Sequence, residues 1–221
     1  MLDINKDNMR GAKTKMDVDE FVSAIYSTMN DCPVWNVVKG MDKGVLEYMQ
    51  KVEEKEKLAY QCFHYIRAFE YGLNLEEWQH ELLNVLLVQR AVEHLNQAKI
   101  LSLAEAEKFL YDKITYYVEM WQKYNTSEDR QKLMMAVACM LIYQKPYEEY
   151  MSREEEIDWS PDLIYGIGMV VSYTETFAQE WYETIGKKYQ VVFNNDDAIR
   201  HTTYAIHYKE LINTWRKIEN V

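Results

Sequence analysis

Glu77 and His80 form a Glu-x-x-His pair within the segment NLEEWQHELLNVLLVQRAVEH, residues 74–94. This i, i+3 spacing brings a carboxylate and an imidazole onto one helix face, and helix bundles use it to hold iron or manganese. Glu81 and Asn84 fall within about 100° of the same face. The chemistry predicted for this position is metal or ligand binding in a helical bundle, with enzymatic activity as one form of it.

The same residues also have a purely structural interpretation. If Asn74 caps the helix, Glu77 takes the third helical position, where a glutamate accepts the N–H of the cap residue and closes a capping box. A di-metal bundle also needs a second Glu-x-x-His and two more inward carboxylates, and the chain has no second copy. We therefore predict a helix start at Asn74, a first turn solvated around His80, and no cofactor. Because LLNVLLV is apolar nearly all round, a buried metal or ligand site remains the alternative, at Glu77, His80, Glu81 and Asn84.

Signatures of other catalytic sites are absent from the sequence. Gly166 and Gly168 lack the third glycine of a dinucleotide-binding loop, and they better suit the close approach of another helix. The chain has no Gly-x-Ser-x-Gly, no phosphate-binding Gly-Lys-Ser/Thr, and no Cys-x-x-Cys among its three cysteines. An enzyme is therefore the less favoured class. The cysteines are expected to be buried free thiols of a cytoplasmic protein.

Negative charge is concentrated in one segment of the chain. The protein has 36 acidic residues against 25 Lys and Arg, a net charge of −11, which disfavours direct binding to nucleic acids or anionic membranes. Residues 147–183 hold ten acidic residues against Arg153 alone, and therefore nine of the eleven excess negative charges. Aromatic side chains lie among these carboxylates, as in YEEYMSREEEIDW.

We interpret this segment as a surface that docks a basic partner protein. Tyr combines a large contact area with a polar tip, and opposite charge accelerates encounter. The predicted docking residues are Glu148, Glu149, Tyr150, Glu154, Glu155, Glu156, Asp158, Trp159, Glu180 and Glu183. The favoured function is a non-enzymatic interaction module, in its sharpest form an inhibitor of a nucleic-acid-binding partner. A solvated acidic face that keeps the protein soluble is the alternative, and self-association is left open.

The elements that must position these residues are helices. Only seven Gly and three Pro occur in 221 residues, which favours long helices over turn-rich β-structure. Cap and stop signals predict seven helices, starting near residues 17, 42, 74, 102, 127, 160 and 195. They form an all-α, irregular helical bundle in one domain, residues 17–221, after a flexible N-terminal arm, residues 1–16. KKYQVVF, residues 187–193, is expected to be a short extended connector, and no apolar run reaches the ~20 residues of a membrane span.

Overall fold

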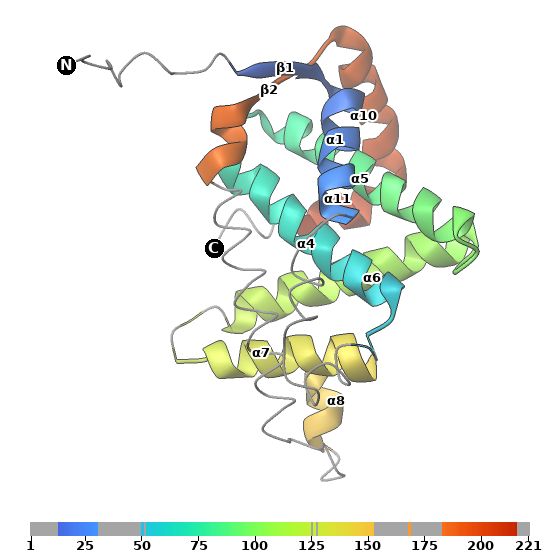
Figure 1. Ribbon diagram of the computed structural model, residues 1–221, viewed down its shortest axis with the longest axis vertical. Coiled ribbons are helices and arrows are strands. Elements are labelled where there is room, and N and C mark those ends of the chain that lie inside the picture. Colours follow the sequence, from blue (N-terminus) through green and yellow to red (C-terminus); the bar gives the residue numbers. More distant parts are fainter. Residues whose placement is uncertain are drawn as a thin grey trace, which may run out of the picture.

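The computed structural model describes residues 13–30, 50, 52–124, 126, 128–152, 168 and 183–215. Most of these residues are helical, which confirms the predicted all-α class (Figure 1). The helical elements in chain order are α1 (Val18–Asn30), α4 (Glu54–Gly72), α5 (Glu77–Gln97), α6 (Leu103–Tyr124), α7 (Arg130–Ala138), the π-helical turn η2 (Cys139–Tyr143), α8 (Tyr147–Ser152), α10 (Asn195–His207) and α11 (Lys209–Trp215). Among the described residues, no helix combines the length and the apolar composition needed to span a bilayer.

Two short strands join the beginning of the chain to its C-terminal part. β1 (Thr14–Asp17) and β2 (Tyr189–Val192) run parallel, with Thr14 opposite Tyr189 and Asp17 opposite Val192. β1 corrects the predicted flexible arm over residues 1–16, because backbone pairing with a strand far along the chain orders residues 14–16; residues 1–12 lie outside the described part. β2 confirms the extended connector predicted for residues 187–193 over Tyr189–Val192, whereas Lys187 and Lys188 are still helical.

Side-chain caps confirm three of the predicted helix starts. Asp17 Oδ1, Ser102 Oγ and Asn194 Oδ1 each accept the backbone N–H of the residue three positions later, at 2.8, 3.4 and 3.1 Å. Each bond satisfies a donor that has no partner inside the helix. These caps set the first residues of α1, α6 and α10.

Other predicted helix limits were wrong. The helix predicted to start near residue 42 does not run unbroken into α4, because Val52 and Glu53 are non-helical and α4 begins at Glu54. Val52 is buried in the core, and this burial depends on tertiary packing, which helix propensity does not predict. The last helix breaks at Tyr208, between α10 and α11. Most of the helix predicted to start near residue 160 lies outside the described part. Residues 183–188 are described, and they are helical.

α5 is the central helix of the described body. It contacts α1, α4, α6 and α10, and its residues Leu82, Leu83 and Leu87 are completely buried. Burying one leucine contributes roughly 1.5–3 kcal/mol, so the apolar run of α5 is a major part of the core. Polar residues on the same helix must therefore find partners on its neighbours.

Small and sulfur-containing residues behave largely as the sequence predicts. A Cβ atom added to Gly168 would lie 3.0 Å from Met134 Cε of α7, in agreement with the expected close approach of another helix. At Gly186 a Cβ would lie 2.2 Å from the carbonyl oxygen of Gly72, so glycine is needed where residues 183–188 meet the end of α4. Cys62 and Cys139 are buried free thiols, and Cys32 lies outside the described residues.

Candidate functional site

The start of α5 differs from the predicted one. Its cap is Glu76 rather than Asn74: the Glu76 N–H donates to Gln79 Oε1 at 2.9 Å, and Trp78 Nε1 donates to Glu76 Oε2 at 2.7 Å. Glu77 is exposed at the first helical position. The capping role predicted for Glu77 is therefore wrong, because a Glu–Gln box two residues further along, supported by the indole of Trp78, replaces it.

Three polar residues of the first two turns of α5 are buried. His80, Glu81 and Asn84 are 6%, 4% and 0% exposed, which overturns the prediction of a solvated first turn around them. Asn84 Nδ2 donates to Glu70 Oε1 at 2.6 Å, and His80 Nδ1 lies 3.5 Å from Glu70 Oε2. Glu70 of α4 is thus shared by two side chains of α5. Burial lowers the pKa of His80, which favours its neutral imidazole.

Glu81 makes its contact with a different helix. Its Oε2 lies 2.7 Å from Nε2 of His201 on α10. The rings of Trp78 and His201 are 6.0 Å apart, so α10 covers the beginning of α5 and shields it from water. The cluster therefore has two halves, one facing α4 through Glu70 and one facing α10 through His201.

This arrangement braces three helices against one another. Within the described ranges, no group of three or more His, Cys, Asp or Glu side chains is placed to hold a metal ion. Glu77 is exposed, whereas His80 lies against Glu70 and Glu81 against His201. Buried carboxylates paired in this way are costly to disrupt, so the cluster holds α4, α5 and α10 together.

Two further His–Glu pairs connect helices nearer the surface. His94 of α5 lies 3.3 Å from Glu54 of α4, and His207 of α10 lies 3.1 Å from Glu107 of α6. Four of the five histidines of the chain therefore contact a glutamate on another helix. These pairs cannot be predicted from sequence spacing, because three of them join residues that are 40, 100 or 120 positions apart.

A second buried polar group lies between α4 and α6. Glu56 is completely buried and pairs with Lys113 at 2.8 Å; burial raises the pKa of Glu56. His64, also on the buried side of α4, has a pKa held well below its usual range by burial and by the charge of Arg67. The guanidinium of Arg67 lies 3.3 Å from the ring centroid of Trp121. No local sequence pattern distinguishes these residues from those of an ordinary amphipathic helix, because their burial depends on the packing of α6 against α4.

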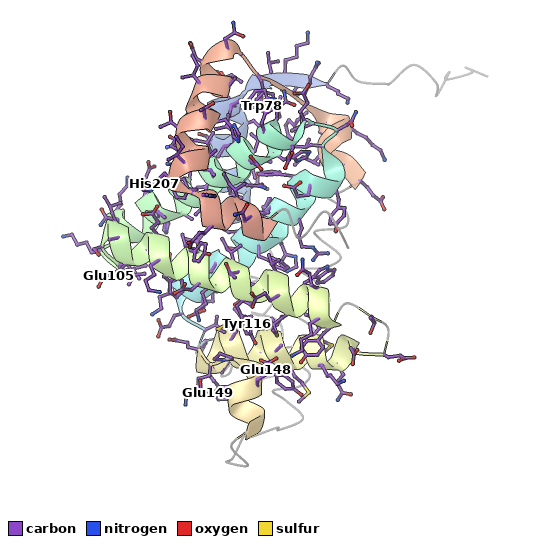
Figure 2. The ribbon with its side chains drawn as sticks, turned by 180° about the vertical axis from the view of Figure 1, so that it is seen from behind. Trp78, Glu105, Tyr116, Glu148, Glu149 and His207 are labelled. Atoms are coloured by element: carbon purple, nitrogen blue, oxygen red, sulfur yellow. The ribbon has the colours of Figure 1, made fainter. Side chains whose placement is uncertain are left out.

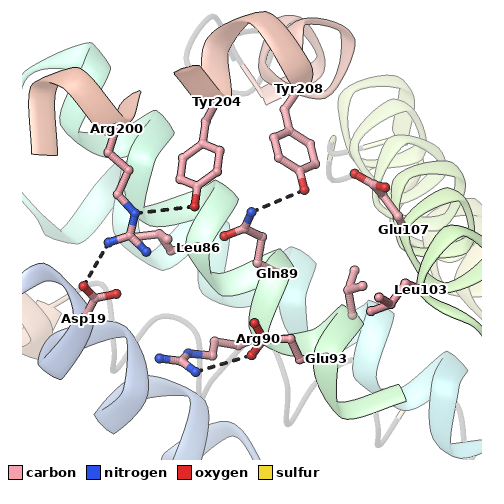
Figure 3. A pocket seen from close by; sticks show the side chains of 11 residues that line it. Asp19, Leu86, Gln89, Arg90, Glu93, Leu103, Glu107, Arg200, Tyr204 and Tyr208 are labelled. Carbon is pink, nitrogen blue, oxygen red and sulfur yellow. Dashed lines mark hydrogen bonds and ion pairs between the residues drawn. The ribbon is translucent and has the colours of Figure 1, made fainter. Parts of the chain in front are cut away.

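Two hollows lie on either side of Tyr208, near the end of α10. One of about 410 Å³ is shown in Figure 3, and its neighbour of about 470 Å³ shares Tyr208 and Glu107 with it. Across the first hollow, Arg200 Nη1 donates to Asp19 Oδ2 at 2.9 Å and Gln89 Nε2 donates to Tyr208 Oη at 3.4 Å. These bonds hold α10 against α1 and α5, so the polar lining of this hollow serves the attachment of α10.

The predicted docking residues are described only in part. Glu148 and Glu149 lie in the first turn of α8, at the end of the molecule opposite Trp78 (Figure 2), and Glu183 is exposed. Glu148 Oε1 lies 2.7 Å from Lys123 Nζ, and this hydrogen bond lowers the pKa of Glu148. The remaining side chains of the predicted set lie outside the described residues: Tyr150, Glu154, Glu155, Glu156, Asp158, Trp159 and Glu180.

Tyrosines attach the start of this segment to the helical body. The Tyr147 N–H donates to Tyr116 Oη at 3.2 Å, and Tyr116 Oη donates to the carbonyl oxygen of Ala136 at 3.3 Å. The rings of Tyr147 and Tyr124 meet edge-on, with centroids 6.3 Å apart. α8 therefore begins from a defined position against α6 and α7. Comparison of the chain with known protein families, curated proteins and solved structures found no match.

Proposed function

We propose that the chain is a cytoplasmic, non-enzymatic interaction module that docks a basic partner protein on its acidic segment, residues 147–183. The observation that carries this proposal is the charge distribution: ten carboxylates against one arginine in this segment. In its sharpest form the module is an inhibitor, whose carboxylates occupy the Lys and Arg side chains that a partner otherwise uses for phosphates. Opposite charge favours rapid encounter with such a surface.

The ion pair between Glu148 of α8 and Lys123 allows a cation of a partner to replace Lys123. The Glu148 side chain remains 47% exposed although it pairs with Lys123, whose side chain is 52% exposed. An exposed ion pair of this kind stabilises the fold very little, so a Lys or Arg of a partner can take the place of Lys123 at little cost. The rings of Tyr124 and Tyr147 beside this pair offer apolar area next to the carboxylate.

Charge reversal within the segment is the direct test. We expect the variant Glu154→Lys/Glu155→Lys/Glu156→Lys to lose basic proteins that the wild-type chain captures from a cell lysate at low salt, as identified by mass spectrometry. The matched control reverses three carboxylates outside the segment, Glu93→Lys/Glu119→Lys/Glu128→Lys, which changes the net charge by the same amount. Because exposed charges are screened by salt, capture by the wild type should weaken as ionic strength rises. Equal recovery by wild type and segment variant, or equal loss in both variants, would reject the segment as the docking surface.

A further inference from the structure

Helix α10 turns Arg200 and His201 toward the body of the protein and both of its isoleucines outward. On the inner side, Arg200 and His201 contact Asp19 and Glu81. On the outer side, Ile199 and Ile206 are 67% and 79% exposed. A surface helix normally buries its aliphatic residues and exposes its charges. α10 is inverted relative to that rule, and its outward apolar face calls for an explanation beyond the fold of one chain.

Two threonines extend this apolar face between the isoleucines. Thr202 Oγ1 donates to the Ala198 carbonyl oxygen at 3.0 Å, and Thr203 Oγ1 donates to that of Ile199 at 3.3 Å. Each hydroxyl proton is thus used within the helix, and the methyl groups remain available for contact. Ile199, Thr202, Thr203 and Ile206 follow the i, i+3, i+4, i+7 spacing of a single helix face. We call these four residues the α10 stripe.

The α10 stripe has the same order of residue types in both chain directions, Ile-x-x-Thr-Thr-x-x-Ile. A two-fold axis between Thr202 and Thr203 would align two antiparallel copies of α10. Ile199 of each copy would then meet Ile206 of the other, and the threonines would meet at the centre. A face that matches itself under a two-fold rotation is what an isologous dimer requires.

Charges beyond the ends of the stripe follow the same symmetry. Asp196 and Lys209 are both exposed, and they are equally distant in sequence from the axis between Thr202 and Thr203. A turn at Tyr208 separates α10 from α11, and the Tyr208 N–H donates to the Tyr204 carbonyl oxygen at 2.7 Å, so Lys209 follows directly after the last turn of α10. Antiparallel copies would bring the Asp196 end of each α10 to the Lys209 end of the other, which favours this alignment over a parallel one.

The surface beside the stripe is hollowed where a second copy would arrive. The hollow of about 470 Å³ is lined by Ile206 together with Ala104 and Tyr111 of α6, and by charged side chains that include Lys108 and Glu210. The antiparallel alignment brings Ile199 of the second copy next to Ile206, at the edge of this hollow. The contact would then extend from α10 onto α6 and bury more apolar area than two helices alone.

We propose that the chain forms an antiparallel, two-fold symmetric dimer through the α10 stripe. The stripe occupies one face of a helix of 13 residues, about 20 Å long, which is small beside the roughly 800 Å² per partner of a standard interface. The dimer is therefore weak, and it dissociates on dilution. α8 lies at the other end of the molecule from α10 (Figure 1), so Glu148 and Glu149 of both copies stay clear of the contact. If the proposed function holds, the dimer is then a bivalent docking module.

Sedimentation over a range of protein concentrations tests the dimer. The wild-type chain should pass from monomer to dimer as concentration rises, whereas Ile199→Lys/Ile206→Lys should stay monomeric. Tyr71→Lys, at a residue of α4 that is 49% exposed, is the matched control and should dimerise like the wild type. A wild-type chain that is monomeric throughout would overturn the proposal and assign the stripe to a different protein. A dimer that survives the two lysines would overturn it equally.

Disulfide trapping tests the antiparallel alignment. In a Cys32→Ser background, with Cys62 and Cys139 buried, Ile199→Cys should cross-link to Ile206→Cys when the two variants are mixed. Neither should cross-link to itself, because like positions lie seven residues apart along the pair, about 10 Å. Self-linking without mixed linking would reject this alignment. Capture of basic proteins by the acidic segment is measured separately, so this proposal and the proposed function can fail independently.

Discussion

Helices α5 and α10 contact each other, yet they depart from the usual division of polar and apolar surface in opposite ways. α5 places His80, Glu81 and Asn84 inside the helical body, and a neighbouring helix supplies a contact for each. α10 leaves Ile199 and Ile206 mostly exposed. Polar residues inside the protein thus serve contacts within the chain, whereas the outward apolar residues of α10 are suited to contacts between chains.

The largest expected effect is a loss of stability when the buried polar residues of α5 lose their partner. Glu70→Ala removes a carboxylate that is 6% exposed and that serves both His80 and Asn84. Because two buried polar groups lose their partner, we expect the free energy of unfolding to fall by about 3 kcal/mol. Urea unfolding measures this change.

An exposed ion pair provides the control for Glu70→Ala. Glu93→Ala removes a 52% exposed carboxylate that pairs with Arg90 and should change stability by less than about 0.5 kcal/mol. Glu70→Ala/Asn84→Ala should cost less than the sum of its two single variants, since the two residues contact each other. Equal losses for Glu70→Ala and Glu93→Ala would show that the buried group does not brace the helices.

A smaller effect is expected from acidification. Burial lowers the pKa of His64 well below its ordinary value of 6.5, so the unfolded chain binds a proton that the folded chain does not. His64 therefore stabilises the fold above the pH at which the unfolded chain titrates, and this contribution is lost as pH falls below that value. The loss reaches at most about 1.4 kcal/mol per pH unit for one such group.

His64→Phe isolates this contribution, because phenylalanine keeps an aromatic ring beside Tyr60 and Phe63. Urea unfolding at several pH values should show a smaller loss of stability below pH 6.5 in His64→Phe than in wild type. The difference between the two proteins cancels the opposite contribution of Glu56, whose pKa is raised by burial. Parallel pH profiles would contradict a buried neutral His64.

The smallest effect on stability is expected at the exposed isoleucines of α10. Ile206→Ser changes a side chain that is 79% exposed, so stability measured at low concentration should change by no more than about 0.5 kcal/mol. Leu83→Ala, at a completely buried position of α5, should cost about 2–5 kcal/mol in the same assay. A comparable loss for Ile206→Ser would mean that Ile206 stabilises the single chain.

Local sequence signals predicted the parts of the fold that depend on neighbours in the chain. The caps at Asp17 and Ser102 were predicted correctly because the cap and the N–H that it accepts are three residues apart. For α10 the sequence left Asn194 and Asn195 as candidates, and Asn194 is the cap. The cap of α5 was misplaced because Glu76 and Gln79 form a competing box that Trp78 supports. Where two local solutions compete within a few residues, small differences in side-chain contacts decide between them.

The amino-acid sequence by itself determined the helical class, several helix starts, the acidic character of residues 147–183 and the palindromic order of the α10 stripe. Only the tertiary structure decided that His80, Glu81 and Asn84 are buried, that β1 pairs with β2, and that the isoleucines of α10 face outward. The physical reason is the distance along the chain over which each kind of interaction acts. Helix periodicity and capping act over three or four residues, whereas burial and ion pairing depend on which distant helix covers a side chain, as His201 covers Glu81 from 120 residues away.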